Sequence, residues 1–217
     1  MIRHHARVFW TLISLLTLCS VHGAWAGAPT DQLREGVDGV IKILRDPELK
    51  GDKQVDQRRA AIAVVAGEIF DFREMARRSL AQHWDKRTPA EQKEFVRLFT
   101  ALIQRSYISK VDQQNVAGSR MTYRGETVDA DHAVVQTTVA LNNGSEMPLG
   151  YRMHKPRDHW QVYDLSLDGI SLVANYRAQF NKIIRTSSYE TLVARLKSNE
   201  ADFSVPSAAS AGTKAVR

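Results

Sequence analysis

The chain has 217 residues, of which 43% are hydrophobic and 25% are charged, and its formal net charge at pH 7 is +6. This length allows one domain of ordinary size with a real core. The basic balance favours contact with anionic surfaces, but no stripe of Lys and Arg interleaved with aromatic residues indicates nucleic-acid binding.

The first 26 residues have the pattern of a cleaved export signal. Two arginines precede the apolar run Val8–Val21, and Ala24-Trp25-Ala26 is a small-x-small cleavage site. A membrane anchor is the alternative, but a spanning helix needs about 20 apolar residues. A lipoprotein signal at Cys19 is disfavoured because a leucine, and not a small residue, precedes that cysteine. We therefore predict that residues 1–26 are removed on export.

Removal of this segment takes away Cys19, the only cysteine, together with two arginines and no acidic residue, so the formal charge falls from +6 to +4. The mature protein then has no disulfide and no thiol chemistry, and its fold depends on its core alone. Export also argues against a nucleic-acid partner.

Apolar residues at helical spacing predict a series of helices in the first half of the chain. One helix runs from Pro29 to the stop at Asp46-Pro47, and the next runs from Gly51-Asp52 to Phe70-Asp71-Phe72, a junction that we consider as a mobile lid. A short helix follows the junction. Thr88-Pro89-Ala90-Glu91 has the N-cap, the Pro and the Glu of a strong helix start. The helix that it opens has the clearest apolar stripe, formed by Phe95, Leu98, Phe99, Leu102, Ile103 and Tyr107.

The sequence then changes from a helical to an alternating period. Residues 119–126, 132–141, 149–153 and 160–167 are predicted to be strands, and Asn142-Asn143-Gly144 is a hairpin turn between two of them. Four consecutive strands joined by short turns form an antiparallel meander.

Helical periodicity returns after Asp168-Gly169. Ser171 is a natural N-cap for a helix whose apolar stripe comprises Leu172, Val173, Tyr176, Phe180, Ile183 and Ile184. Ser187 with Glu190 indicates a capping box for a second, shorter helix.

These elements predict an α+β fold, a four-stranded antiparallel meander sheet covered by a layer of helices. The folded unit is predicted to be a single domain of residues 27–202. Residues 203–217 are rich in Ser, Ala, Pro and Gly without an apolar period, and we predict a disordered tail there.

An enzyme is the main rival to a binding protein. Gly169-x-Ser171-x-Val173 has only part of a nucleophile elbow, because a valine replaces the second glycine, so Ser171 is interpreted as an N-cap. Asp168 is interpreted as a turn residue. Asp164 lies in an apolar strand, where a carboxylate usually has a structural partner, and catalysis by Asp164 is the alternative.

Metal and phosphate sites have little support in the sequence. His154 and His159 flank a turn, and zinc would need further ligands that the sequence does not place nearby, so both are interpreted as solvated. No glycine-rich phosphate loop is present. Arg58-Arg59 and Arg77-Arg78 could meet phosphate head groups, but charge pairs on helices are usually solvated faces.

One long motif is similar to that of a known family. The run V-Y-D…D-G-I-S-L-V-x-N-Y-R-x-Q-F-x-x-I-I-R over residues 162–185 resembles the signature of the MlaC family, and F-D-F-R-E-M-A-R at 70–77 extends the resemblance. Members of this family, the toluene-tolerance proteins, are periplasmic phospholipid-binding components of an outer-membrane lipid transport pathway. The resemblance covers most of residues 30–200.

The resemblance implies that the space between sheet and helices is an apolar cavity for acyl chains, with the head group outside. It implies a periplasmic, monomeric carrier without catalysis or cofactor. Its implied partners are phospholipid, an outer-membrane lipoprotein complex and an inner-membrane ABC transporter complex. The alternatives are an enzyme for a small apolar substrate with Asp164 as base, and a structural subunit with a filled core.

Within this resemblance, the apolar stripes predict which residues contact lipid. The predicted lipid-binding residues are Phe70, Phe72, Met75, Phe95, Phe99, Leu102, Ile103, Tyr107, Val139, Tyr151, Met153, Val162, Leu165, Val173, Tyr176, Phe180 and Ile184.

Overall fold

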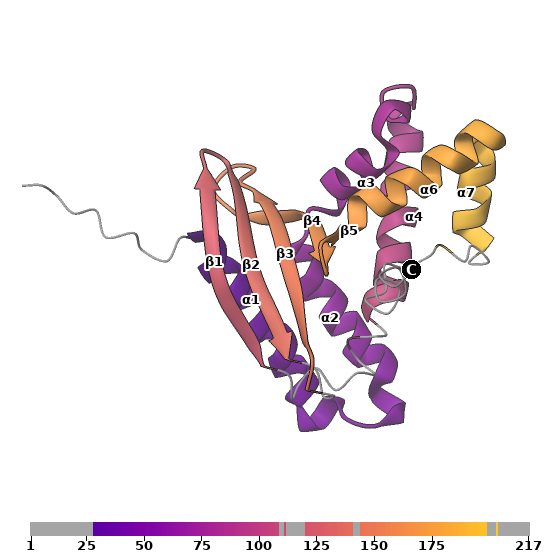
Figure 1. Ribbon diagram of the computed structural model, residues 1–217. Helices are drawn as coiled ribbons and strands as arrows, with labels where there is room; N and C mark the ends of the chain where they lie inside the picture. Colours follow the sequence, from indigo (N-terminus) through magenta and orange to yellow (C-terminus); the bar gives the residue numbers. More distant parts are fainter. Residues whose placement is uncertain (1–27, 109–110, 112–119, 141–143, 199–202, 204–217) are drawn as a thin grey trace, which may run out of the picture.

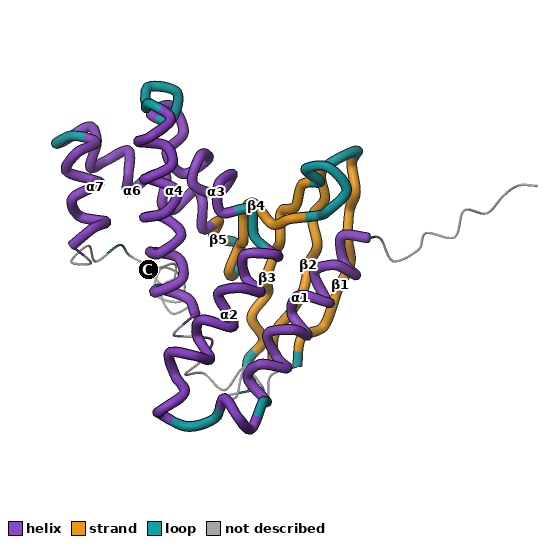
Figure 2. The backbone as a smooth tube through the Cα atoms, turned by 180° about the vertical axis from the view of Figure 1, so that it is seen from behind, coloured by secondary structure: helices purple, strands orange, loops and turns teal. Residues whose placement is uncertain are grey.

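The computed structural model describes residues 28–108, 111, 120–140, 144–198 and 203 (Figure 1). Its architecture is α+β, as predicted. An antiparallel sheet carries two helices on one face, and a separate group of helices lies beyond the β4–β5 edge of the sheet (Figures 1 and 2). The predicted export signal and the hairpin turn residues 142 and 143 lie outside the described residues.

The sheet has the strand order β1-β2-β3-β4-β5, with every neighbouring pair antiparallel. The predicted meander is therefore confirmed, and a fifth strand of two residues extends it. Between β4 and β5, Asp168 and Gly169 adopt φ angles of 49° and 78°, a tight turn that suits glycine. The strands are β1 Met121–Asp129, β2 His132–Ala140, β3 Glu146–His154, β4 Gln161–Leu167 and β5 Ile170–Ser171.

Two helices, α1 (Ala28–Arg45) and α2 (Val55–Ile69), cover one face of the sheet (Figure 2). The backbone N–H and the hydroxyl of Thr30 both donate to the Glu126 carboxylate on β1. The Gln32 side-chain oxygen accepts from the Trp160 N–H at 2.7 Å. These bonds attach the beginning of α1 to both edges of the sheet. The short turns Pro47–Leu49 and Asp52–Gln54 connect α1 to α2.

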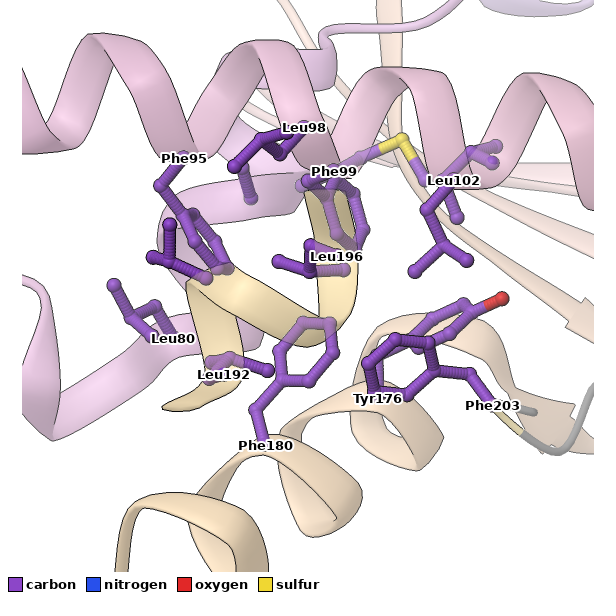
Figure 3. Packing of buried hydrophobic residues seen from close by; sticks show 14 of the residues in the cluster. Leu80, Phe95, Leu98, Phe99, Leu102, Tyr176, Phe180, Leu192, Leu196 and Phe203 are labelled. Atoms are coloured by element: carbon purple, nitrogen blue, oxygen red, sulfur yellow. The ribbon is translucent and has the colours of Figure 1, made fainter. Parts of the chain in front are cut away.

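The remaining helices pack mainly on one another. Their buried side chains form a core of their own, which we call the helical cluster (Figure 3). Its members come mostly from α3 (Phe72–Leu80), α4 (Pro89–Ile103), α6 (Leu172–Thr186) and α7 (Tyr189–Ser198). A 3₁₀ turn, Ala81–His83, follows α3, and a π-helical turn, Gln104–Ile108, ends α4.

The observed beginnings of α4 and α6 agree with those predicted from the sequence. Thr88 and Glu91 form the predicted capping box at α4, and Ser171 accepts from the Ala174 N–H at 3.0 Å as the predicted N-cap of α6. The capping box predicted at Ser187 is wrong by one residue. Ser188 accepts from the Thr191 N–H at 3.1 Å, because α6 continues to Thr186 and its C-cap uses Ser187.

Phe203 belongs to the folded unit, although the prediction placed it in the tail. Its side chain is buried in the helical cluster, with its ring centroid 5.4 Å from that of Phe180 and 6.3 Å from that of Tyr176 (Figure 3). The apolar surface that the ring buries stabilises this position, although the neighbouring residues in the sequence are mostly small or polar. Residues 204–217 lie outside the described residues.

Within the described part of the chain, no helix is both long enough and apolar enough to cross a bilayer.

Candidate functional site

The residues predicted to bind lipid divide between two separate cores. One is the helical cluster, and the other lies between the sheet, α1 and α2, which we call the sheet cluster. Phe70 packs against both clusters. The other predicted residues divide into a helical group, Phe72, Met75, Phe95, Phe99, Leu102, Ile103, Tyr107, Val173, Tyr176, Phe180 and Ile184, and a sheet group, Val139, Tyr151, Met153, Val162 and Leu165.

Four rings of the helical cluster are enclosed on every side. Phe95, Phe99, Tyr176 and Phe180 each have 0% of their surface exposed. The centroids of neighbouring rings lie 5.6 to 6.2 Å apart, in stacked, edge-on and tilted pairs typical of filled aromatic cores (Figure 3). A ring with neighbours on every side does not face an open hollow. Contact between a ligand and these rings would therefore require the cluster to open.

The sheet cluster is closed at one end and less covered at the other. At the closed end, Ala133, Met153 and Val162 are aligned across β2, β3 and β4, with 3%, 1% and 0% of their surface exposed. At the opposite end of the same face, the aligned residues are Met121, Val139 and Met147, and both methionines are half-buried. On β3, coverage of this apolar face therefore decreases from Met153 through Tyr151 and Leu149, which are 5% and 8% exposed, to the half-buried Met147.

The covering helix shows the same gradient. Leu33, near the attached beginning of α1, is 1% exposed, whereas Val37 one turn later is half-buried against the sheet cluster. Along β4, Val162 is enclosed and Leu165 and Leu167 are half-buried. Five half-buried apolar side chains, together with the buried Val139, thus lie toward one end of the sheet cluster. We call this end, defined by Val37, Met121, Val139, Met147, Leu165 and Leu167, the open end.

Neutral hydroxyl groups are the polar groups inside this face. Thr137 is buried beside the aligned Leu149, and burial raises the pKa of the Tyr151 phenol, so that it stays protonated at every physiological pH. One charged group borders this face, because the Arg34 guanidinium of α1 lies over the ring of Tyr123, with its central carbon 4.6 Å from the ring centroid. The open end therefore offers an apolar surface with few hydrogen-bond demands, which suits a hydrocarbon chain.

Asp164 is the only buried carboxylate among the described residues. One of its oxygens accepts from the Ser171 hydroxyl at 2.6 Å, and the other accepts from the Val173 N–H at 3.0 Å. Asp164 therefore joins β4 to the beginning of α6, where a negative charge is stabilised by the free N–H groups. This is the structural pairing that we predicted for it, and both oxygens are occupied.

The junction at Phe70-Asp71-Phe72 is bonded to the sheet. The Asp71 N–H donates to the Val162 carbonyl at 2.9 Å, and its carboxylate accepts from the Glu74 N–H at 2.9 Å as the N-cap of α3. Its other oxygen lies 3.0 Å from Nε2 of His154. These three bonds hold the junction in place, so we do not retain the hypothesis of a mobile lid.

His154, Arg77 and Arg78 each bond to a carboxylate. His154 is half-buried against Asp71, and the interpretation of His154 as solvated is wrong, whereas His159 is exposed. Arg77 and Arg78 both bond to Glu74 at 2.7 Å. Among the described residues, no group of three or more His, Cys, Asp or Glu side chains is arranged to hold a metal ion.

The sequence prediction named two of the six residues that define the open end, Val139 and Leu165, and did not name the other four. Val37, Met121, Met147 and Leu167 carried a signal, because each occupies the apolar period of its helix or strand. The prediction did not include them because the helices at 95–107 and 172–184 have apolar stripes that are richer in aromatic residues. The side chains of those stripes form the helical cluster.

Comparison with known proteins agrees with this architecture. The family model described as MlaC protein matches residues 34–198. Among solved structures, the chain is similar to the phospholipid-binding protein from Ralstonia solanacearum, determined in complex with a phospholipid at 1.53 Å. The two sequences are 28% identical, and the match covers 82% of this chain and 100% of that chain with a TM-score of 0.68. The chain therefore belongs to the MlaC family.

Proposed function

We propose that this protein is a periplasmic carrier that binds phospholipid and does not catalyse a reaction. The observation that carries the proposal is the open end of the sheet cluster, an apolar surface with half-buried aliphatic and methionine side chains. The similar protein from Ralstonia solanacearum binds a phospholipid, which supports the same class of ligand here.

Energetics explain why such a carrier needs a protected apolar site. Burial of a CH₂ group is worth ~0.8 kcal/mol, so two chains of roughly sixteen carbons represent on the order of 25 kcal/mol of unfavourable exposure to water. A surface groove leaves much of that area wet. A site that begins at the open end and extends between the sheet and its covering helices covers far more of it, with the head group in water.

The route of the lipid is part of the same proposal. We infer that the carrier exchanges phospholipid with an outer-membrane lipoprotein complex and an inner-membrane ABC transporter complex, and that it acts as a monomer. Membership of the MlaC family supports these partners. A head group that stays in water contributes little to specificity, so we expect tolerance of different head groups.

The ligand can be tested by organic extraction of protein purified from the periplasm of a bacterial host, followed by mass spectrometry. We expect phospholipid in a near-equal molar amount. Val37→Asn, at the open end, should reduce it several-fold, because the amide has no partner beside a hydrocarbon chain. Val64→Asn is the matched control, since Val64 lies on α2 with 67% of its surface exposed and should keep wild-type lipid.

Circular dichroism of both variants checks that they fold. Wild-type protein that yields no phospholipid in repeated preparations would overturn the proposed function. Equal lipid in Val37→Asn and Val64→Asn would keep the function and reject the open end as the site.

A further inference from the structure

Two methionines form the last aligned row of the sheet cluster at its open end. Met121 on β1 and Met147 on β3 are the cross-strand partners of Val139 on β2, on the inner face of the sheet. Both side chains are half-buried and pack against the sheet cluster. We call Met121 and Met147 the methionine pair.

The other two methionines of the described residues have a different environment. Met153 lies on the same inner face at the closed end, and Met75 lies in the helical cluster, and each is 1% exposed. They are ordinary core residues. The methionine pair is therefore distinguished by its position on a surface that the folded chain leaves partly uncovered.

Two charged side chains near this row lie on the opposite face. Arg124 on β1 donates to the Thr138 hydroxyl at 3.1 Å and to the carboxylate of Glu146 on β3 at 3.2 Å, and these residues alternate with the inner-facing positions. On the inner face, the charged groups beside β1 are engaged by neighbours, because Arg34 of α1 lies over the Tyr123 ring and Glu126 accepts from Thr30.

Methionine is suited to a ligand whose shape varies. Its side chain is unbranched, has three rotatable bonds and ends in a polarisable thioether, so it fills irregular spaces and recurs at promiscuous binding surfaces. Phospholipids from a membrane vary in chain length and in the position of cis double bonds. A pair of branched side chains would fit fewer of these shapes.

We propose that Met121 and Met147 contact the bound acyl chains and give the carrier its tolerance of chain length and unsaturation. This inference rests on the proposed function, because it assigns the residues that adapt to the hydrocarbon of the same ligand. It predicts that bound lipid covers the methionine pair.

Hydrogen peroxide labelling tests the contact directly. Lipid-loaded protein and protein delipidated and refolded are treated in parallel, and sulfoxide formation at each methionine is followed by mass spectrometry. We expect Met121 and Met147 to oxidise at least several-fold more slowly in the loaded protein. Met75 and Met153 are internal controls, which should oxidise slowly in both samples because they are enclosed.

Lipid occupancy is measured in the same samples, so a failure of the proposed function is recognised separately. If lipid is present and the methionine pair oxidises at the same rate with and without it, the inference is overturned. Protection that follows protein concentration and not lipid would assign the pair to a contact between copies of the chain, which also overturns it.

Substitution tests the tolerance. The double variant Met121→Leu/Met147→Leu nearly conserves side-chain volume, and Met75→Leu/Met153→Leu is the matched control. We expect both to retain phospholipid, and only the first to bind a narrower distribution of chain lengths and double bonds than wild type. An unchanged distribution in Met121→Leu/Met147→Leu would overturn the assigned role.

Discussion

At the scale of single residues, the carboxylates that stand out in the sequence hold helices in place. Asp71 and Asp164 each accept an N–H at the beginning of a helix, at α3 and α6 respectively, and each also bonds to a residue of another element. Glu74 accepts from two arginines of its own helix. These bonds explain how the chain can place acidic residues in partly or fully buried positions.

Glu74 gives a prediction for acid stability. Burial favours its protonated form, but the hydrogen bonds and charges of Arg77 and Arg78 outweigh burial and lower the pKa of Glu74 from 4.5 to about 2. Its stabilising effect is therefore complete above pH 4.5 and is lost as the pH falls toward 2. Glu74→Gln should be less stable at neutral pH by about 1 kcal/mol or less, because solvent screens the pairs.

Thermal unfolding of both proteins at a series of pH values measures this effect. The difference in melting temperature should shrink below pH 4.5 and disappear below about pH 2, where the wild-type carboxyl also becomes neutral. A difference that stays constant from pH 7 to pH 2 would mean that the charge of Glu74 does not stabilise the fold.

At the scale of elements, periodicity predicted most helices and strands, including the capping box at Thr88 and the N-cap at Ser171. It could not predict which helices cover the sheet. An apolar stripe requires that a helix be buried, but the stripe is the same whether the partner is a sheet or another helix. The stripe of α1 faces the sheet, and the stronger stripes of α4 and α6 face each other.

The candidate site was harder to predict for the same reason. A residue that contacts lipid and a residue of a filled core are both apolar and occupy the same period. The difference lies in coverage by distant segments, such as α1 and α2 over the sheet (Figure 2), and the sequence of a single strand does not show that coverage. The aromatic stripes were therefore assigned to the ligand, and in the structure Phe95, Phe99, Tyr176 and Phe180 of these stripes are enclosed in the helical cluster.

The filled aromatic core can be tested with two phenylalanines. Phe99 is fully enclosed in the helical cluster, whereas Phe72 is half-buried at its border. Phe99→Ala should lower the free energy of unfolding by roughly 3–5 kcal/mol through lost burial and a new void, and Phe72→Ala should cost clearly less. Urea unfolding followed by far-ultraviolet circular dichroism gives both values. Equal costs would show that Phe99 borders an open space.

At the scale of the whole molecule, the two clusters meet at only a few described side chains. Phe70 and Leu167 are the partly buried residues that pack against both. The helical cluster is closed by its own rings, and the sheet cluster is incomplete at one end. A ligand at the open end would therefore cover the apolar side chains that the folded chain leaves half-buried.

Ligand binding should consequently raise the stability of the fold. A ligand present at about 100 times its Kd stabilises the native state by about 2.7 kcal/mol. We expect lipid-loaded protein to melt at a higher temperature than delipidated protein, by differential scanning calorimetry. The rise should be smaller for Val37→Asn and unchanged for Val64→Asn. Identical melting of the loaded and delipidated wild type would show that the lipid is not bound to the folded state.

The burial of Phe203 has a practical consequence for anyone who shortens this protein. A version that stops at residue 202 would leave the edges of Tyr176 and Phe180 without their aromatic neighbour. Bare aromatic edges at a surface promote self-association. Truncations for crystallisation or for attachment of an affinity tag should therefore keep Phe203, and a tag at the other end should leave the Thr30–Glu126 bond room to form.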